Sequence, residues 1–183
     1  MNGKSIGLIE LTSVVAGFAA ADAMLKAGDV RLLLSRSICS GKYMVLIGGE
    51  PAAVESALEA GVRAGRGCLI DRTLIANLHP EVLAAIGRGT VPKPEGALGL
   101  VESFQVATMV AAADAAVKAA DVRIHELRLA MALGGKAFVA LSGEVAAVQA
   151  GVAAARRVVE EAGALVNAVV LARPHPDVYR EMV

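Results

Sequence analysis

Two cysteines give this chain its clearest capacity for chemistry, because a thiolate can bind a metal or act as a nucleophile. Cys39 begins the run Cys39-Ser40-Gly41-Lys42, which predicts a hairpin loop between two apolar segments. Cys68 follows Gly65-Arg66-Gly67, where a helix is expected to give way to a strand. Two cysteines are too few for a disulfide framework and are typical of a reducing compartment. From the residues alone, Cys39 is either an inert loop residue or a metal ligand, and Cys68 is expected to pack in the core.

The remaining polar residues do not form a recognisable catalytic or nucleotide-binding pattern. His79 and His175 each precede a proline, which predicts a turn or the start of a helix. His125 lies in a predicted strand and is expected to be a satisfied or solvent-facing side chain. Gly134-Gly135-Lys136 lacks the spacing and the Ser/Thr of a phosphate-binding loop. No nucleophile, base and acid occur at a recognisable spacing, so we do not expect an enzyme.

Composition and charge exclude several kinds of partner. The 183 residues include 18 basic and 18 acidic side chains with no basic cluster, which argues against nucleic acid. Charged residues interrupt every apolar stretch before the ~18 residues of a membrane span, and the start of the chain shows no secretion signal. We therefore expect a cytoplasmic protein that neither binds nor crosses a membrane. The chain is 56% hydrophobic but only 3% aromatic, and surplus apolar surface of this kind favours oligomerisation.

The sequence is an internal repeat. Ile6-Gly7-Leu8-Ile9-Glu10 recurs as Leu98-Gly99-Leu100-Val101-Glu102, and His79-Pro80-Glu81-Val82 recurs as His175-Pro176-Asp177-Val178. Between the copies lies a segment rich in Pro, Gly and charge, which is typical of a linker. We therefore predict a first domain over residues 1–88, a linker over 89–96 and a second domain over 97–183.

Each copy predicts the element order β-α-β-β-α-β followed by a short helix. In the first copy the expected elements are strand 5–11, a helix to residue 27 capped by Thr12-Ser13, strands 30–38 and 43–47, helix 51–66, strand 69–78 and helix 79–86. This order is that of a ferredoxin-like unit, an antiparallel sheet with two helices on one face. The predicted fold is therefore α+β, with two ferredoxin-like domains in tandem.

Segments of both copies resemble the signatures of bacterial microcompartment shell domains. The resembling segments are Gly7-Leu8-Ile9-Glu10, Ala21-Asp22-Ala23-Met24-Leu25-Lys26, the glycine-bearing hairpin loop and Ala172-Arg173-Pro174-His175. The resemblance covers nearly the whole chain and implies a component of a microcompartment shell. Tandem members of this family form homotrimers that mimic the hexagonal tiles of single-domain members, with six shell domains around a central axis. Other shell proteins at the tile edges are the implied partners.

The loop around Cys39 is similar to the cysteine-bearing pore loop of trimeric shell proteins from propanediol-utilising microcompartments, which are thought to hold an iron–sulfur cluster. The resemblance implies that Cys39 is the metal ligand and that the pore loop comprises Ser37, Ile38, Ser40, Gly41 and Lys42. Ser40 departs from the proline that we expect at this position in those relatives.

One cysteine per chain cannot form a four-thiolate site, but a loop near a three-fold axis brings three copies of Cys39 together. A [4Fe–4S] cube has a three-fold axis through one iron, so three symmetric thiolates can bind three irons and leave the fourth to water or another ligand. We therefore expect one [4Fe–4S] cluster per trimer, shared on the axis.

Lys26 and Lys118 occupy matched positions, each four residues after an aspartate. Such a pair can be a surface ion pair within a helix. In the family, the matching lysine lies along the tile edge where neighbouring oligomers meet, and Arg173 resembles the edge arginine, which the first copy lacks. The resemblance therefore assigns Lys26, Lys118 and Arg173 to the tile edge.

Three hypotheses of function follow. The first is a shell tile whose cluster on Cys39 passes single electrons across the shell, to or from an encapsulated or cytoplasmic redox enzyme. The second is a metal-free shell tile with a metabolite pore. The third, from another class, is a regulatory module that binds a small metabolite between subunits.

Overall fold

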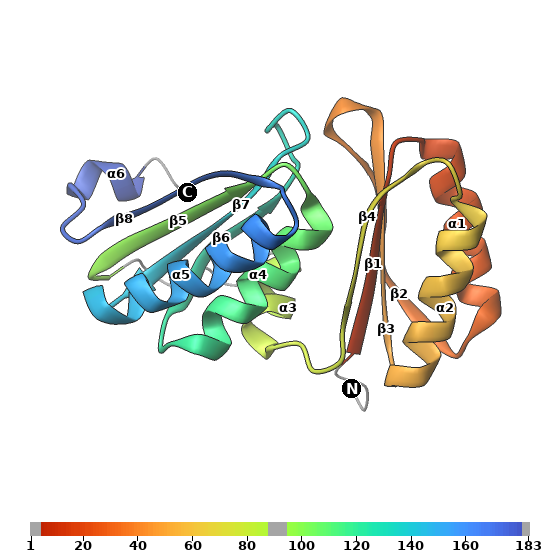
Figure 1. Ribbon diagram of the computed structural model, residues 1–183, viewed down its shortest axis with the longest axis horizontal. Helices are drawn as coiled ribbons and strands as arrows, with labels where there is room; N and C mark the ends of the chain where they lie inside the picture. The colour runs from red at the N-terminus through yellow and green to blue at the C-terminus, as the bar shows by residue number, and fades with distance from the viewer. Residues whose placement is uncertain (1–4, 88–94, 181–183) are drawn as a thin grey trace. The chain divides into compact units, whose positions relative to one another are not determined.

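The computed structural model describes residues 5–87 and 95–180, which divide into two compact units (Figure 1). The first unit contains the chain up to Leu78 together with Gln105–Ala107 and Ala130–Gly135. The second unit contains His79–Phe104, Thr108–Leu129 and the chain from Lys136 onward. The predicted linker, 89–96, lies outside the described residues except for its last two positions. The repeat boundaries 1–88 and 97–183 stay a prediction.

The first unit is a four-stranded antiparallel sheet with two helices on one face, as predicted (Figure 1). The sheet order is β2-β3-β1-β4, which is the order of a ferredoxin-like unit. Its elements are β1 (Ser5–Leu11), α1 (Val14–Ala27), β2 (Val30–Ile38), β3 (Lys42–Gly49), α2 (Pro51–Ala64) and β4 (Leu69–Ile75).

The second unit repeats this topology, with the sheet order β6-β7-β5-β8. Its elements are β5 (Ala97–Ser103), α4 (Val106–Ala119), β6 (Arg123–Leu129), β7 (Ala137–Gly143), α5 (Val145–Glu161) and β8 (Leu165–Leu171). Two short helices, α3 (Pro80–Ile86) and α6 (Pro176–Arg180), follow the last strands of the two repeats. The α+β class and the tandem arrangement are therefore confirmed.

Local sequence explains where the elements begin and end. The Ser13 hydroxyl accepts a hydrogen bond from the Ala16 amide and caps α1, as the sequence predicts. The prediction that the last strand extends to residue 78 is wrong, since β4 ends at Ile75. Ile75 pairs with Ile6 near the start of β1, so the residues beyond it have no strand to pair with.

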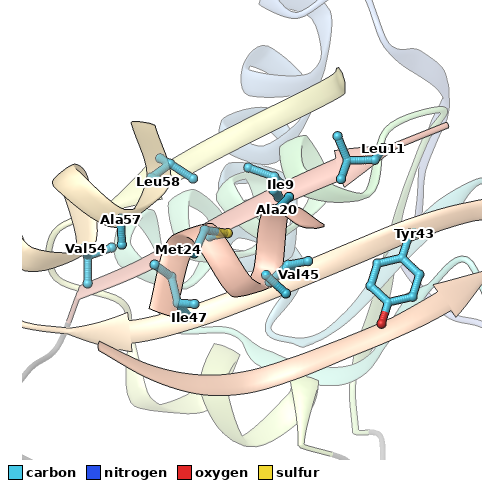
Figure 2. Packing of buried hydrophobic residues seen from close by; sticks show 11 residues of the cluster. Ile9, Leu11, Ala20, Met24, Tyr43, Val45, Ile47, Val54, Ala57 and Leu58 are labelled. Atoms are coloured by element: carbon cyan, nitrogen blue, oxygen red, sulfur yellow. The ribbon is translucent and has the colours of Figure 1, made fainter. Parts of the chain in front are cut away.

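The core of the first unit lies between its helices and its sheet (Figure 2). Tyr43 on β3 is 4% exposed, and its ring occupies the space beside Gly17 on α1. A Cβ at Gly17 would lie only 2.2 Å from the Tyr43 ring, which no real contact allows. The equivalent positions of the second repeat carry Met109 and Ala137, both fully buried. In the first repeat the helix carries the small residue and the strand the large one, and in the second repeat the helix carries the large residue and the strand the small one. This exchange keeps the total side-chain volume between helix and sheet similar.

No helix within the described residues is long and apolar enough to cross a membrane.

Gly17→Ala is expected to lower the free energy of unfolding by about 1–3 kcal/mol, because the new methyl group overlaps the Tyr43 ring. Urea denaturation of the purified variant measures this loss. Gly87→Ala is the control, since a Cβ there meets only carbonyl oxygens at 3.6 Å. Equal stabilities of the two variants would contradict the assigned packing.

Candidate functional site

Cys39 begins a short 3₁₀ turn, Cys39–Gly41, that joins the end of β2 to the start of β3. Within this turn Ser40 has a φ of 65°, and Gly41 has a φ of 72°. Proline fixes φ near −65°, so it cannot adopt the backbone conformation of Ser40. The serine at this position is therefore part of what gives the loop its shape.

The Cys39 sulfur receives a hydrogen bond from a second loop of the first unit. The Ala132 amide donates to Cys39 Sγ at 3.0 Å, and the Cys39 amide donates to the Ala130 carbonyl at 3.2 Å. This loop, Ala130–Gly135, follows β6 and has positive φ angles at Ala130 and Ala132 as well as at its two glycines. Turns of this kind point backbone amides toward one spot and favour an anion there.

The amides of the Ala130–Gly135 loop favour the charged form of Cys39. Hydrogen bonding from the backbone of Leu133 has the largest effect and lowers the pKa of the thiol, and the backbones of Ala132, Gly135 and Gly134 act in the same direction. Desolvation opposes these contributions without cancelling them. A thiolate is the form that binds iron or zinc and reacts with electrophiles.

A buried ion pair lies at the base of the two loops. Glu10 on β1 is fully buried; its Oε1 accepts from Lys42 Nζ at 2.8 Å, and its Oε2 accepts from the Val106 amide at 2.7 Å. Val106 is the first residue of α4, where an N–H has no partner within the helix and a negative charge is favoured. Lys42 Nζ also lies 3.4 Å from the Gly135 carbonyl. The pair therefore anchors β3, the start of α4 and the loop beside Cys39.

A single chain does not assemble a metal site among its described residues. No group of three or more His, Cys, Asp or Glu side chains comes together there. Cys39 and Cys68 are both free thiols. Any metal on Cys39 must therefore take its other ligands from outside the described part of one chain. Cys39 fits a thiolate ligand of iron, because backbone amides favour its charged form.

Comparison with known proteins identifies the family to which this architecture belongs. A family model described as the BMC domain matches residues 5–78 and again residues 97–174. The bacterial microcompartment shell protein PduT of Citrobacter freundii is 40% identical over 181 residues, covering 98% of each chain. The carboxysome shell protein CsoS1 of Prochlorococcus marinus is 41% identical over 91 residues, which is 48% of this chain and 87% of that one. The crystal structure of a microcompartment protein from Desulfitobacterium hafniense matches with a TM-score of 0.86 and 44% identity, covering 96% of this chain and 98% of that one.

The chain belongs to the bacterial microcompartment shell proteins. The resemblance read from the sequence is confirmed, and so is the presence of two shell domains in tandem. As a shell protein the chain is a structural component of the microcompartment.

The predicted pore-loop residues of this shell protein lie in three different elements. Ser37 and Ile38 end β2, where Ser37 is exposed and Ile38 is buried at 6% exposure. Ser40 and Gly41 form the turn with Cys39, while Lys42 starts β3 with its amine on Glu10. Within the chain, Lys42 is thus a partner of a buried carboxylate.

The two predicted edge lysines each bind the aspartate one turn earlier on the helix. Lys26 Nζ lies 2.6 Å from Asp22 Oδ2, with both side chains exposed, and Lys118 Nζ lies 2.5 Å from Asp114 Oδ2. The Asp114 side chain is only 9% exposed, against 63% for Asp22. Arg173 is exposed. The edge role of all three stays a prediction.

The other singled-out residues have structural roles. Cys68 packs against the core cluster of the first unit, and its carbonyl accepts from the Thr12 amide at 2.8 Å. His79 caps α3, since its Nδ1 accepts from the Glu81 amide, so the prediction of a helix start is confirmed. His125 lies on β6 at 4% exposure.

The sequence interpretation missed the loop Ala130–Gly135 and the contact of Glu10 with Val106. Gly41-Lys42 recurs as Gly135-Lys136, which identifies this loop as the counterpart of the cysteine loop, but the recurrence does not indicate that the two loops are in contact.

Lys42→Met is expected to lower the free energy of unfolding by about 3 kcal/mol, because it leaves the Glu10 carboxylate buried without its cation. The matched control is Lys136→Met, which removes the equivalent cation beside Glu102. Glu102 is 29% exposed and stays solvated, so the loss there should be under about 1 kcal/mol. Urea denaturation compares the two, and equal losses would contradict the burial argument.

Proposed function

We propose that this shell protein forms a homotrimeric tile in which three Cys39 thiolates bind one [4Fe–4S] cluster on the three-fold axis. The observation that carries the proposal is the hydrogen bond from the Ala132 amide to Cys39 Sγ at 3.0 Å. A turn that presents backbone amides to a sulfur stabilises a thiolate and so prepares a metal ligand. An inert loop cysteine requires no such partner.

A trimer supplies what one chain lacks. Cys39 is the one chemically poised thiol of the chain, and a closed three-fold ring multiplies it into three ligands around one axis. Bound there, a [4Fe–4S] cluster supplies one-electron transfer between the two faces of the shell. The Ala132 amide donates a hydrogen bond to the sulfur, and the backbone of Leu133–Gly135 also favours its charged form. Hydrogen bonds to a cluster sulfur favour the more reduced state of the cluster.

Unequal burial of equivalent residues supports association of several chains. Val15 and Phe18 on α1 are 80% and 64% exposed, while their counterparts Ala107 and Val110 on α4 are fully buried. Two large apolar side chains on one helix face are costly to leave in water, at about 25 cal/mol per Å² of apolar surface. The surface that covers them belongs to a neighbouring molecule in the proposed tile.

Replacing Cys39 by Ser tests the cluster. All three thiolates are lost at once, so the variant should bind no iron after anaerobic reconstitution, while Cys68→Ser should keep the parental iron content. Iron analysis and absorbance in the sulfur-to-iron charge-transfer region measure both. The fourth iron lacks a cysteine, so oxidation should convert the signal toward [3Fe–4S] in electron paramagnetic resonance.

Iron retained by the Cys39→Ser variant, or lost only from the Cys68→Ser variant, would contradict the assignment. A parent protein that assembles and binds no iron would support the metal-free tile with a metabolite pore.

Replacing Lys26 and Lys118 together by Ala tests the tile edge. The parent should have the mass of three chains by light scattering, and the variant should keep that mass while forming smaller sheets in electron microscopy. The control is Arg63→Ala with Arg156→Ala, which removes two cations that also form exposed i,i+4 pairs. Sheets of unchanged extent in the lysine variant would exclude the edge role.

A further inference from the structure

Within the second unit, the helix that ends the first repeat is fastened to α4 and β6. The His79 amide donates to Asp114 Oδ1 at 2.8 Å, and Glu81 Oε1 accepts from the Ile124 amide at 2.5 Å. The Arg123 guanidinium lies 3.7 Å from Glu81 Oε2. These contacts attach the start of α3 by its backbone and by one carboxylate.

The surface of α4 and β6 that contacts α3 is shielded from solvent. Val82 on α3 is fully buried, Ile124 is 3% exposed, and the Asp114 side chain is 9% exposed. The Ile124 amide lies at a register shift of the β6–β7 ladder, between Ile124 and Glu126. A register shift in an edge strand leaves an amide for a partner other than the ladder, and Glu81 takes it.

The first unit carries the same receiving surface without an occupant. The β2–β3 ladder has its register shift at the equivalent residue, between Leu32 and Leu34. Leu32 is 43% exposed, and Arg31 beside it is exposed. Asp22 Oδ2 binds Lys26 as Asp114 Oδ2 binds Lys118, yet the Asp22 side chain is 63% exposed. Nothing in the described part of the chain fills this position.

The chain also carries a second copy of the fastening segment. His175-Pro176-Asp177-Val178 repeats His79-Pro80-Glu81-Val82. Its local structure is the same, since the Asp177 amide donates to His175 Nδ1 at 3.3 Å as the Glu81 amide donates to His79 Nδ1 at 3.4 Å. Val178, however, is 40% exposed. The segment His175–Val178 therefore has the local conformation of His79–Val82, but it is exposed to solvent instead of being packed on a helix and a strand.

We propose that the segment His175–Val178 docks on Asp22, Arg31 and Leu32 of a second copy of this chain. The His175 amide donates to Asp22 Oδ1, the Asp177 carboxylate accepts from the Leu32 amide and pairs with Arg31, and Val178 covers the Leu32 side chain. Each contact repeats one that the same sequence already makes within the second unit.

A second copy is the occupant because, among the described residues, each chain has one such exposed segment and one such exposed surface. The Tyr179 hydroxyl donates to the Gly96 carbonyl at 2.8 Å, which keeps α6 on the second unit of its own chain. A segment and a surface that differ give a head-to-tail contact; such contacts form a ring when the rotation between neighbours closes, as it does in the proposed trimer, and an open filament otherwise. Arg31 and Asp177 carry opposite charges, as Arg123 and Glu81 do. The docking rests on the proposed trimer and names the contact that joins its chains.

Charge reversal tests the contact. Arg31→Glu and Asp177→Arg should each raise the concentration at which the assembly dissociates by about tenfold, because each places like charges together. The double variant should return to within about twofold of the parent, since the pair is restored with its signs exchanged. Sedimentation velocity over a dilution series measures the three. Arg63→Glu on α2 is the control and should leave dissociation unchanged.

Hydrogen exchange gives a second readout. The Leu32 amide should exchange more slowly in the assembled parent than in Asp177→Arg, and the double variant should recover the protection. A parent that assembles with three chains while both single variants dissociate as the parent does would overturn the docking and leave the proposed tile intact. A parent that stays monomeric at all concentrations would overturn both. Arg31→Glu that changes monomer stability without changing dissociation would place the contact within one chain and overturn the proposal.

Discussion

The buried carboxylate of Glu10 is the constraint on which the rest of the site depends. A charge without access to water is tolerated only when it is paired and hydrogen-bonded, and Glu10 has both an ammonium and a helix N-terminal amide. Satisfying Glu10 therefore requires Lys42 to stay at the start of β3 and Val106 to stay beside β1. Because Lys42 also reaches the Gly135 carbonyl, the same pair sets the end of the loop whose amides meet Cys39.

The two repeats share a fold and differ in what covers them. Glu10 is fully buried while Glu102 is partly exposed, and Ala107 is buried while Val15 is open. Such differences between equivalent residues do not come from local sequence, since the elements themselves match. The differences in exposure reflect which of two equivalent surfaces is covered by other residues of the same chain. Under the proposed assembly, each exposed member of a pair marks a surface that a neighbouring chain would cover, and its buried counterpart shows how.

Periodicity and capping were sufficient to predict the elements and their order, because each strand and helix is specified by residues close in sequence, such as Ser13 at the start of α1. The end of β4 was not predictable, since it depends on where β1 begins. Cys39 was predicted as the candidate ligand from its place in a turn together with the resemblance of its loop to the cysteine-bearing loops of shell proteins. Its amide donors were missed because Ala130–Gly135 has no composition that indicates sulfur binding. A backbone amide donates a hydrogen bond whatever side chain its residue carries, so only the fold reveals which amides contact Cys39.

A tandem chain can assign different tasks to equivalent loops, which a ring of identical domains cannot. Six identical cysteine loops around one axis would offer six thiolates, more than a four-iron cluster accepts. In this chain the first loop carries Cys39, and the equivalent loop of the second repeat carries alanine, leucine and glycine with amides turned toward that sulfur. In the proposed trimer this division would leave three thiolates, each beside a loop of its own chain. Under the proposal, fusion of two shell domains would lower the symmetry of the thiolate ring from six to three, and three is the number that matches the cluster.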